Sequence, residues 1–320
     1  MQLDIGLRGD SISIGNGFSV NFQRTLRIPD DGKSYPLPPG LGRFPIRRID
    51  DYLDRVPKSW AKRGGVLIPI YQREAMWLSF SSASPHAVQV GVGKVCAITG
   101  EPWSDSLSLI EQNYVVTPSQ PWLDGINIGN GLIRQFVAMP LGMGYTVEGQ
   151  VTGKETFGGL QLQVFQSKEG AFPEVDEEVD CCLCEDAAEA SAGGMGLAAG
   201  GQMSQKIYPD PYDFDVWNPE RSGRVFVHLV NSQQWREITG EAPPETPVTA
   251  KEYARHGFPW FELYDEKAAT LPGSKVLKKV KSVATKDQTV FGTALQDESP
   301  VSVPTTITLK HPNGVRDGDW

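Results

Sequence analysis

The fold class of this chain is decided by residues 64–98. They read GGVLIPIYQREAMWLSF over residues 64–80 and, after a short polar turn, HAVQVGVGKVCAI over residues 86–98. Both runs are rich in β-branched and aromatic residues, the composition of strands packed against a core. We therefore predict consecutive strands in this region.

The same pattern extends in both directions along the chain. Upstream, LDIGL, SISIG and FSVNF alternate apolar and polar positions, and downstream NYVVT, LIRQFVAMPL, GYTVEGQVT and LQLQVFQ continue to residue 166. Gly, Pro and Asn interrupt the pattern about every ten residues, as turns do in a β-sandwich or barrel. Residues 1–166 are predicted to form one β-rich domain of sandwich or barrel type.

One segment of this N-terminal half predicts a helix. IRRIDDYLDRV, residues 46–56, spaces its apolar side chains at helical intervals before Pro57, which ends a helix. Ile46, Ile49, Leu53 and Val56 would lie on one face of this helix.

Residues 167–206 are predicted to be a connector. From Glu169 to Gln205 the chain carries nine carboxylates and no Lys, Arg or His, and its second half is the small-residue run ASAGGMGLAAGGQM. Glycine adopts many backbone angles at little steric cost, and like charges repel one another. The acidic part and the Gly/Ala-rich part together suggest a mobile or exposed segment.

Residues 207–320 are predicted to contain both strands and helices, with a β-rich C-terminal tail. RVFVHLV and VPTTITLK predict strands, whereas NSQQWREITG and TAKEYARHG predict short helices. Asn231 with Gln234, and Thr249 with Glu252, have the spacing of N-terminal capping boxes, and a glycine follows each helix. The predicted fold class is mainly β (α+β), with a mixed α/β C-terminal part.

Composition and charge exclude several classes of protein. The 34 Gly and 24 Pro favour a turn-rich globular chain over a helix bundle, and the formal charge of -9 provides no general field for nucleic acid. The most basic stretch, SKVLKKVKSVATK at residues 274–286, predicts an amphipathic helix with solvated lysines. We expect no nucleic-acid partner.

We expect a cytoplasmic protein without a membrane partner. The N-terminus lacks the pattern of a signal peptide, and no run of about 18 apolar residues occurs. Four cysteines, two of them adjacent, do not form a disulfide framework in a chain of 320 residues.

Neither the cysteines nor the glycines predict a cofactor. Cys181, Cys182 and Cys184 contain no CxxC pair, and the four histidines form no HExxH motif. GGMGLAAGG lacks the lysine and hydroxyl of a phosphate loop, and the nearby carboxylates would repel phosphate. No cofactor is predicted.

The loop DPYDFDVWNPE, residues 210–220, groups several acidic side chains. Oxygen ligands at short spacing suit calcium, and the candidates are Asp210, Asp213 and Asp215. Their spacing is not that of an EF-hand, so turn-forming roles are favoured and no metal is predicted.

A catalytic role for this loop would require a second titratable side chain beside its carboxylates. Asp213 and Asp215, with His228 as an acid or base, could act on a polar or carbohydrate-like substrate. His228 lies in the middle of a predicted strand, however, and a core histidine is the favoured interpretation.

Aromatic rings beside carboxylates also suggest carbohydrate binding. The ligand-binding candidates are Trp103 (near Asp105), Trp122 (near Asp124), Trp217 and Trp260. Anchoring roles in the core or in an interface are the competing interpretation for these rings.

Several longer segments carry a family resemblance. RTLRIPDDGKSYPLPPGLGRFPI, QFVAMPLGMGYTVEGQVTG, MGLAAGGQMSQKIYPDPYDFDVW and VNSQQWREITGEAPPETPVTAKEYARHGFPWFELYD resemble a family of uncharacterised bacterial and fungal proteins over residues 24–285. Some fungal relatives carry a ubiquitin-like domain, of which this chain shows no sign. The resemblance provides no catalytic residue, but it implies that the GLAAGG part is ordered and that Glu169 to Glu189 is the mobile part.

These observations favour a non-enzymatic binding or self-assembling structural protein with a protein partner, most simply a second copy of itself. The alternative is an enzyme acting through the acidic residues near 210–220 and His228. A further alternative treats the acidic connector as a docking segment for a basic partner. Turn-punctuated strands, aromatic residues and the lack of a dense catalytic motif support the first hypothesis.

Overall fold

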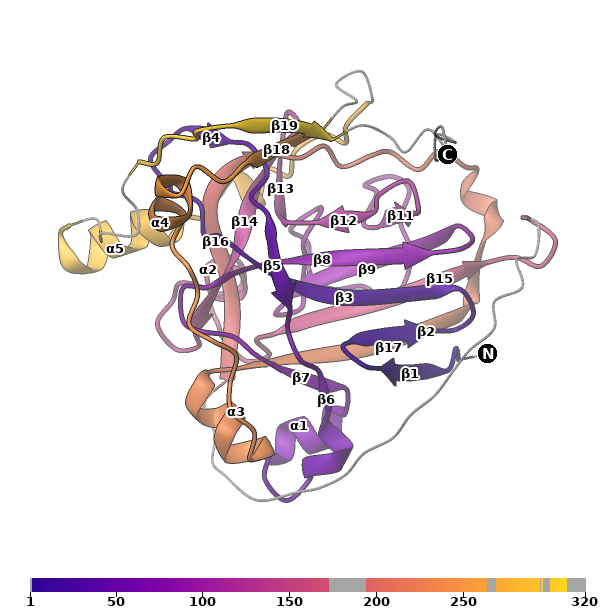
Figure 1. The fold of residues 1–320 in the computed structure, drawn as a ribbon. Coiled ribbons are helices and arrows are strands. Elements are labelled where there is room, and N and C mark those ends of the chain that lie inside the picture. The colour runs from indigo at the N-terminus through magenta and orange to yellow at the C-terminus, as the bar shows by residue number, and fades with distance from the viewer. Residues whose placement is uncertain (1, 173–193, 264–268, 294, 296–299, 310–320) are drawn as a thin grey trace, which may run out of the picture.

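The computed structural model describes residues 2–172, 194–263, 269–293, 295 and 300–309 (Figure 1). The chain is mainly β, as the strand pattern predicted, with helices in both halves. The segment GYTVEGQVT, predicted as a strand, instead contains the helix Val147–Thr152, which Thr146 caps by accepting from the N–H of Gly149. The strands before the acidic segment are β1 (Ile5–Arg8), β2 (Ser11–Ile14), β3 (Phe18–Thr25), β4 (Ser34–Tyr35), β5 (Gly40–Arg43), β6 (Arg47–Arg48), β7 (Val66–Pro69), β8 (Ala75–Ser82), β9 (His86–Val92), β10 (Val95–Cys96), β11 (Val115–Thr117), β12 (Trp122–Leu123), β13 (Gly125–Gly129), β14 (Leu132–Pro140) and β15 (Leu160–Ser167).

The later strands and the helices complete the chain. The strands are β16 (Gly194–Ser204), β17 (Trp217–Val230), β18 (Trp260–Leu263) and β19 (Thr306–Leu309). The α-helices are α1 (Lys58–Arg63), α2 (Val147–Thr152), α3 (Ser232–Thr239), α4 (Ala250–Arg255) and α5 (Val283–Phe291), and the 3-10 helices are η1 (Ile49–Tyr52), η2 (Phe214–Val216) and η3 (Leu277–Lys279). No helix within the described ranges has both the length and the apolar character needed to cross a membrane.

The strand pairings follow a path that returns to its start. β1, β2 and β3 pair in sequence, β3 pairs with β8, and β8 pairs with β14 (Figure 1). From β14 the antiparallel path continues through β16 to β17, and β15 lies between β17 and β9. The backbone N–H of Leu3, just before β1, donates to the carbonyl of Ser222 in β17 at 3.0 Å. The path of pairings therefore nearly closes on itself, but it needs β16 and β17, which lie beyond the residues 1–166 predicted to form a sandwich or barrel.

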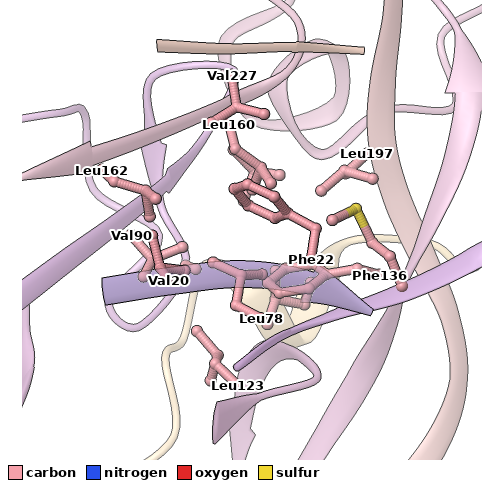
Figure 2. Packing of buried hydrophobic residues seen from close by; sticks show 14 of the residues in the cluster. Val20, Phe22, Leu78, Val90, Leu123, Phe136, Leu160, Leu162, Leu197 and Val227 are labelled. Carbon is pink, nitrogen blue, oxygen red and sulfur yellow. The ribbon is translucent and has the colours of Figure 1, made fainter. Parts of the chain in front are cut away.

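Alternating apolar side chains fill the interior of this arrangement. Phe22 of β3 and Leu78 of β8 lie across from Leu160 of β15 and Val227 of β17, with Phe136 of β14 among them (Figure 2). All five side chains are fully buried, and burying a side chain of this size contributes about 2 to 3 kcal/mol. Because strand side chains alternate between two faces, the apolar positions visible in the sequence became the core.

The Gly/Ala-rich part of the predicted connector is a strand. β16 pairs with β14 along most of its length, and it is largely buried. A Cβ atom at Gly201 would lie 2.3 Å from the carbonyl oxygen of Pro29, so glycine is needed for close backbone approach. The prediction of a flexible Gly/Ala connector was wrong for this half, and the family resemblance had implied order here. The acidic half, with Cys181, Cys182 and Cys184, lies outside the described residues.

The predicted domain boundaries fall within the sheet. β15 lies before the boundary at residue 166 and β17 after the boundary at residue 206, and the two strands pair from Leu160↔Val227 to Ser167↔Trp217. β16, between the two boundaries, pairs with strands on both sides of it. Each of the three predicted segments therefore contributes strands to the main sheet.

Residues 46–56 do not form the predicted helix. Arg47 and Arg48 pair with β7 as strand β6, and only the single 3-10 turn η1 follows. Ile49 is fully buried, whereas Leu53, on the same predicted face, is 49% exposed. Pairing with β7 satisfied the backbone groups that a helix would have satisfied internally, so tertiary context overrode the helical pattern.

The two capped helices were predicted correctly. The side chain of Asn231 accepts from the N–H of Gln234 at the start of α3, and Thr249 accepts from Glu252 at the start of α4. Residues 274–286 instead split into η3 and the beginning of α5, and Ser282 caps α5. Leu277, Val280 and Val283 of this basic stretch are buried, which explains the helical spacing.

Candidate functional site

A pocket of about 380 Å³ lies beside the edge of β9. β10 and β11 both pair with this edge, at Val92 and at Val88 respectively, so the chain between them must loop out and return. That loop, residues 97–114, forms most of the pocket wall. The lining residues are Gln89, Cys96, Thr99, Glu101, Pro102, Trp103, Ser104, Ser106, Leu107, Ser108, Ile110, Glu111 and Asn113.

Asn113 braces the pocket loop from within. Its Nδ2 donates to the carbonyl of Ser106 at 3.0 Å, and its Oδ1 accepts from the N–H of Ser108 at 2.9 Å. The thiol of Cys96 donates to the carbonyl of Asn113 at 3.5 Å. These side-chain hydrogen bonds to backbone groups hold the pocket loop in one conformation.

Gln89 of β9 is part of the pocket lining and supports the loop from the sheet. Its side chain is buried, with an exposed fraction of 2%, and its Nε2 donates to the carbonyl of Ser106 at 3.0 Å. Its Oε1 has no hydrogen-bond partner in the described part of the chain. An unsatisfied buried carbonyl costs about 1 to 3 kcal/mol, and because Oε1 is closed off from solvent, this cost falls on the packing between sheet and loop.

A second unused acceptor lies next to it. Gln163 of β15 stands directly opposite Gln89 in the strand register, and it is equally buried. Its Nε2 donates to Ser222 Oγ at 3.1 Å, while its Oε1 is without a partner in the residues described. Side chains opposite each other on antiparallel strands share a face, so two acceptors lie together beneath the loop.

Trp103 forms an aromatic wall of the pocket. Its indole Nε1 donates to Asp105 Oδ1 at 2.9 Å, and Asp105 Oδ2 pairs with Arg224 Nη1 at 2.8 Å. A Cβ atom at Gly91 would lie 2.6 Å from the ring, so the ring packs on the bare backbone of β9. Among the four tryptophans that the sequence indicated, Trp103 is the one that lines this pocket.

Asp105 is held in its ionised form. Burial by itself would raise the pKa of this carboxyl, but hydrogen bonds from Trp103 and Arg224 and the positive charge of Arg224 lower it below its ordinary value. Asp105 therefore orients the indole ring and is poorly suited to donate a proton.

The other three tryptophans have different surroundings. Trp260 is fully buried against Tyr35, and buried Trp217 donates its Nε1 to Asp210 Oδ2 at 2.7 Å. Trp122 is partly buried, but neighbouring Asp124 is fully buried and accepts from Gln205 Nε2 at 2.7 Å. Burial raises the pKa of Asp124 to about 7, and its hydrogen bonds from Trp122 and Gln205 only partly oppose that shift.

The acidic loop does not form a metal centre. Asp210 accepts hydrogen bonds from the hydroxyl of Tyr114 at 2.6 Å and from Trp217, so its carboxylate holds these two buried aromatic side chains in place. Asp213 and Asp215 are exposed at η2. Within the residues that the structure describes, no group of three or more His, Cys, Asp or Glu side chains could hold a metal ion.

His228 lies in the core. Its ring stacks between Trp60 and Phe226, with centroid separations of 4.5 and 4.4 Å, and its Nε2 donates to the carbonyl of Gly64 at 3.1 Å. Burial lowers the pKa of His228 to about 3, so the ring is neutral. Because His228 stands near one end of β17 and Asp213 and Asp215 precede its other end, the three candidate catalytic residues do not form one site.

The sequence analysis did not identify Gln89 or Asn113. A signal existed for Gln89, because it interrupts the apolar run HAVQVGV, just as Gln161 and Gln163 interrupt LQLQVFQ. A strand buried on both faces has little room for amides without a partner. For Asn113 no local signal was present, because its role depends on the path of the loop.

A comparison of the chain with protein-family models, curated proteins and solved structures found no match. The functional argument therefore rests on the fold and on the chemistry of the pocket.

Proposed function

We propose that this chain is a non-enzymatic binding protein that holds a small hydroxylated molecule, of the size of a sugar, in the pocket beside β9. The observation that carries the proposal is the pocket itself, a hollow of about 380 Å³ that brings the ring of Trp103 together with Ser104, Ser106 and Ser108.

The size and lining of the pocket suit such a ligand. Its volume of about 380 Å³ lies in the range of small-molecule sites, which is roughly 300–1,000 Å³. Trp103 offers an aromatic surface for the C–H groups of a sugar ring. Ser104, Ser106 and Ser108 add hydroxyls, each of which can both donate and accept hydrogen bonds.

The surroundings of the pocket favour binding over catalysis. Asp105, the carboxylate bonded to Trp103, already accepts two side-chain hydrogen bonds and carries a lowered pKa. Glu101 and Glu111 are exposed on the pocket rim, where water keeps carboxylates from the burial that tunes a general acid. The alternative enzyme hypothesis loses support because its candidate residues lie apart. A cytoplasmic location remains part of the proposal and rests on the cysteine content.

The test uses D-glucose, D-glucosamine, N-acetyl-D-glucosamine and D-glucuronate as probes. We expect at least one of them to shift the NMR signal of the Trp103 indole N–H, assigned with a Trp103→Phe variant, and to give a saturable isotherm by calorimetry. Gln89→Met should weaken that binding about tenfold, because it keeps the side-chain length but removes the hydrogen bond by which Gln89 Nε2 holds the carbonyl of Ser106 in the pocket loop.

Gln166→Met is the matched control, because Gln166 lies on the neighbouring strand β15 and does not line the pocket. It should bind like the wild type. The proposal would be abandoned if none of the four probes bound, or if Gln89→Met bound as tightly as the wild type.

Self-association is a second candidate function, favoured by the tip of the same loop. Ile110 is 99% exposed and Leu109 beside it is largely exposed, an unusual position for two adjacent large apolar side chains. We expect light scattering to detect a dimer or larger species, and Ile110→Ser to weaken it. A monomer across the accessible concentration range would count against this role.

A further inference from the structure

The first strand, β1, has an open edge. It pairs with β2 over residues 5–8, and in Figure 1 it lies at the margin of the strands that face the viewer. On its other side, the described part of the chain pairs only before the strand begins, where Gln2 bridges to Ser222 and the N–H of Leu3 donates to the Ser222 carbonyl. An edge strand presents a row of backbone N–H and C=O groups with which another strand can pair.

The outward backbone groups of this edge belong to Ile5 and Leu7. The carbonyl of Asp4 accepts from the N–H of Gly15 at 2.8 Å, on the side of β2. Because the backbone groups of successive strand residues face alternate edges, those of Gly6 also face β2, whereas those of Ile5 and Leu7 face outward. Ile5 is 38% exposed and Leu7 is partly exposed, so a second strand can reach both residues.

The sequence of this edge is complementary to itself. Residues 4–8 read DIGLR. When a second copy of the strand runs antiparallel with Gly6 opposite Gly6, Asp4 lies opposite Arg8 at both ends, and Ile5 lies opposite Leu7. Opposite charges and apolar pairs at facing positions both stabilise antiparallel strands. Within the described residues, neither Asp4 nor Arg8 takes part in an ion pair, and both are exposed, so their charges are available to a partner.

The neighbouring registers lack this match. Facing residues must share one face of the sheet, so a two-fold axis passes through a residue position and the nearest alternatives lie one residue away. With Leu7 opposite Leu7, Asp4 would face Asp10 and like charges would repel each other. With Ile5 opposite Ile5, pairing would need the N–H of Leu3, which is already bonded to β17.

We propose that two copies of this chain associate through β1, so that their main sheets join across a two-fold axis at Gly6. Ile5 and Leu7 of each copy exchange backbone hydrogen bonds with Leu7 and Ile5 of the other, and Asp4 of each copy pairs with Arg8 of the other. Such an interface uses the same patch on both subunits, which is why the patch must be complementary to itself. The inference gives self-association, the second candidate function, a defined surface, and it does not depend on the pocket.

The experiment uses two charge reversals, Asp4→Arg and Arg8→Asp, in the full chain, followed by analytical ultracentrifugation. We expect the wild type to form a dimer. Each variant alone places like charges opposite each other at both ends of the strand, so its dimer dissociation constant should rise at least about tenfold. An equimolar mixture of the two variants should form a mixed dimer with an affinity close to that of the wild type, because every reversed charge then faces an opposite one. Added salt should weaken the mixed dimer.

Two further variants serve as controls. Arg255→Asp changes the net charge by the same amount as Arg8→Asp at an exposed position of α4, which Figure 1 shows far from β1, and it should dimerise like the wild type. The double variant, Asp4→Arg with Arg8→Asp, restores both charge pairs within one chain and should dimerise without a partner variant. Far-UV circular dichroism checks that each variant is folded.

The outcomes separate this interface from the other proposals. If the wild type is a monomer throughout the accessible concentration range, both this inference and self-association fail, whereas ligand binding in the pocket stands. If each single variant dimerises like the wild type, the inference is overturned, and self-association through another surface such as the loop tip stands. If neither the mixture nor the double variant recovers the dimer, the assigned register is overturned. Recovery on mixing supports the interface, because misfolding of a variant would not be repaired by the other.

Discussion

The buried carboxyl of Asp124 should give the stability of this protein a pH dependence that one substitution removes. Asp124 is 4% exposed, its Oδ2 accepts from Gln205 Nε2 at 2.7 Å, and its own N–H donates to Gln205 Oε1 at 3.0 Å. Burial disfavours the charged form and raises the pKa to about 7 in the folded state, against 3.8 in an unfolded chain.

The sign of the effect follows from these two values. Between pH 3.8 and 7 the folded protein holds a proton that the unfolded chain has released. The stability that this proton contributes is therefore complete below pH 3.8 and is lost as the pH rises through 7. A separation of about three pH units corresponds to about 4 kcal/mol of unfolding free energy.

The perturbation is Asp124→Asn, which preserves the size of the side chain and one acceptor for Gln205. The assay is urea unfolding, followed by tryptophan fluorescence, of both proteins at intervals from pH 4 to pH 8. We expect the free energy of unfolding of the variant, minus that of the wild type, to rise by about 4 kcal/mol over this range. Taking the difference removes the contributions of all groups common to both proteins.

Asp105→Asn is the control, because the pKa of Asp105 is lowered and its stabilising effect is lost only as the pH falls through the acid range. The corresponding difference should be level from pH 5 to pH 8. A level difference for Asp124→Asn as well, within about 1 kcal/mol, would refute the reasoning that burial makes Asp124 titrate near neutral pH.

Three further predictions concern the core. In the wild type, the buried ring of His228 has a pKa of about 3 and stays neutral below pH 6.5, where the same histidine of the unfolded chain binds a proton. This difference destabilises the folded protein by about 1.4 kcal/mol per pH unit on acidification, and His228→Gln should remove that contribution. An unchanged pH dependence of the unfolding free energy in urea titrations would contradict this. Asp287→Ala should cost about 3 kcal/mol, because it removes the buried partner of Arg73, and a loss below about 1 kcal/mol would argue against a structural ion pair. Phe136→Ala should lower the unfolding free energy by about 3 to 5 kcal/mol, whereas Phe258→Ala, at an exposed site, should change it by less than about 1 kcal/mol; equal losses by chemical denaturation would contradict the assigned core.

Local patterns in the sequence predicted the strands and the capped helices because their causes are local. The alternation in residues 11–22 places every second side chain on the core face, and the Asn231 and Thr249 caps need only the next turn of helix. The helix predicted for residues 46–56 failed because its competitor, pairing with β7, is distant in the sequence.

The candidate site was predicted only in part. Trp103 and its bond to Asp105 could be suspected from their spacing, and the structure places Trp103 in the pocket wall. Gln89 acquires its role from the carbonyl of Ser106, which the pocket loop brings back over β9. Asn113 acquires its role from the carbonyl of Ser106 and from the path of the loop.

The sequence by itself determined the mainly β character of this protein, its strongly apolar strand faces, the caps of α3 and α4 and the absence of a general positive field. Each of these follows from side chains a few positions apart or from composition. Only the tertiary structure decided that the Gly/Ala-rich run is a buried strand, that His228 is enclosed by aromatic rings and that Gln89 is left with an unused acceptor. These features depend on which strands become neighbours, and strand pairing is set by the burial of the whole core rather than by any single segment.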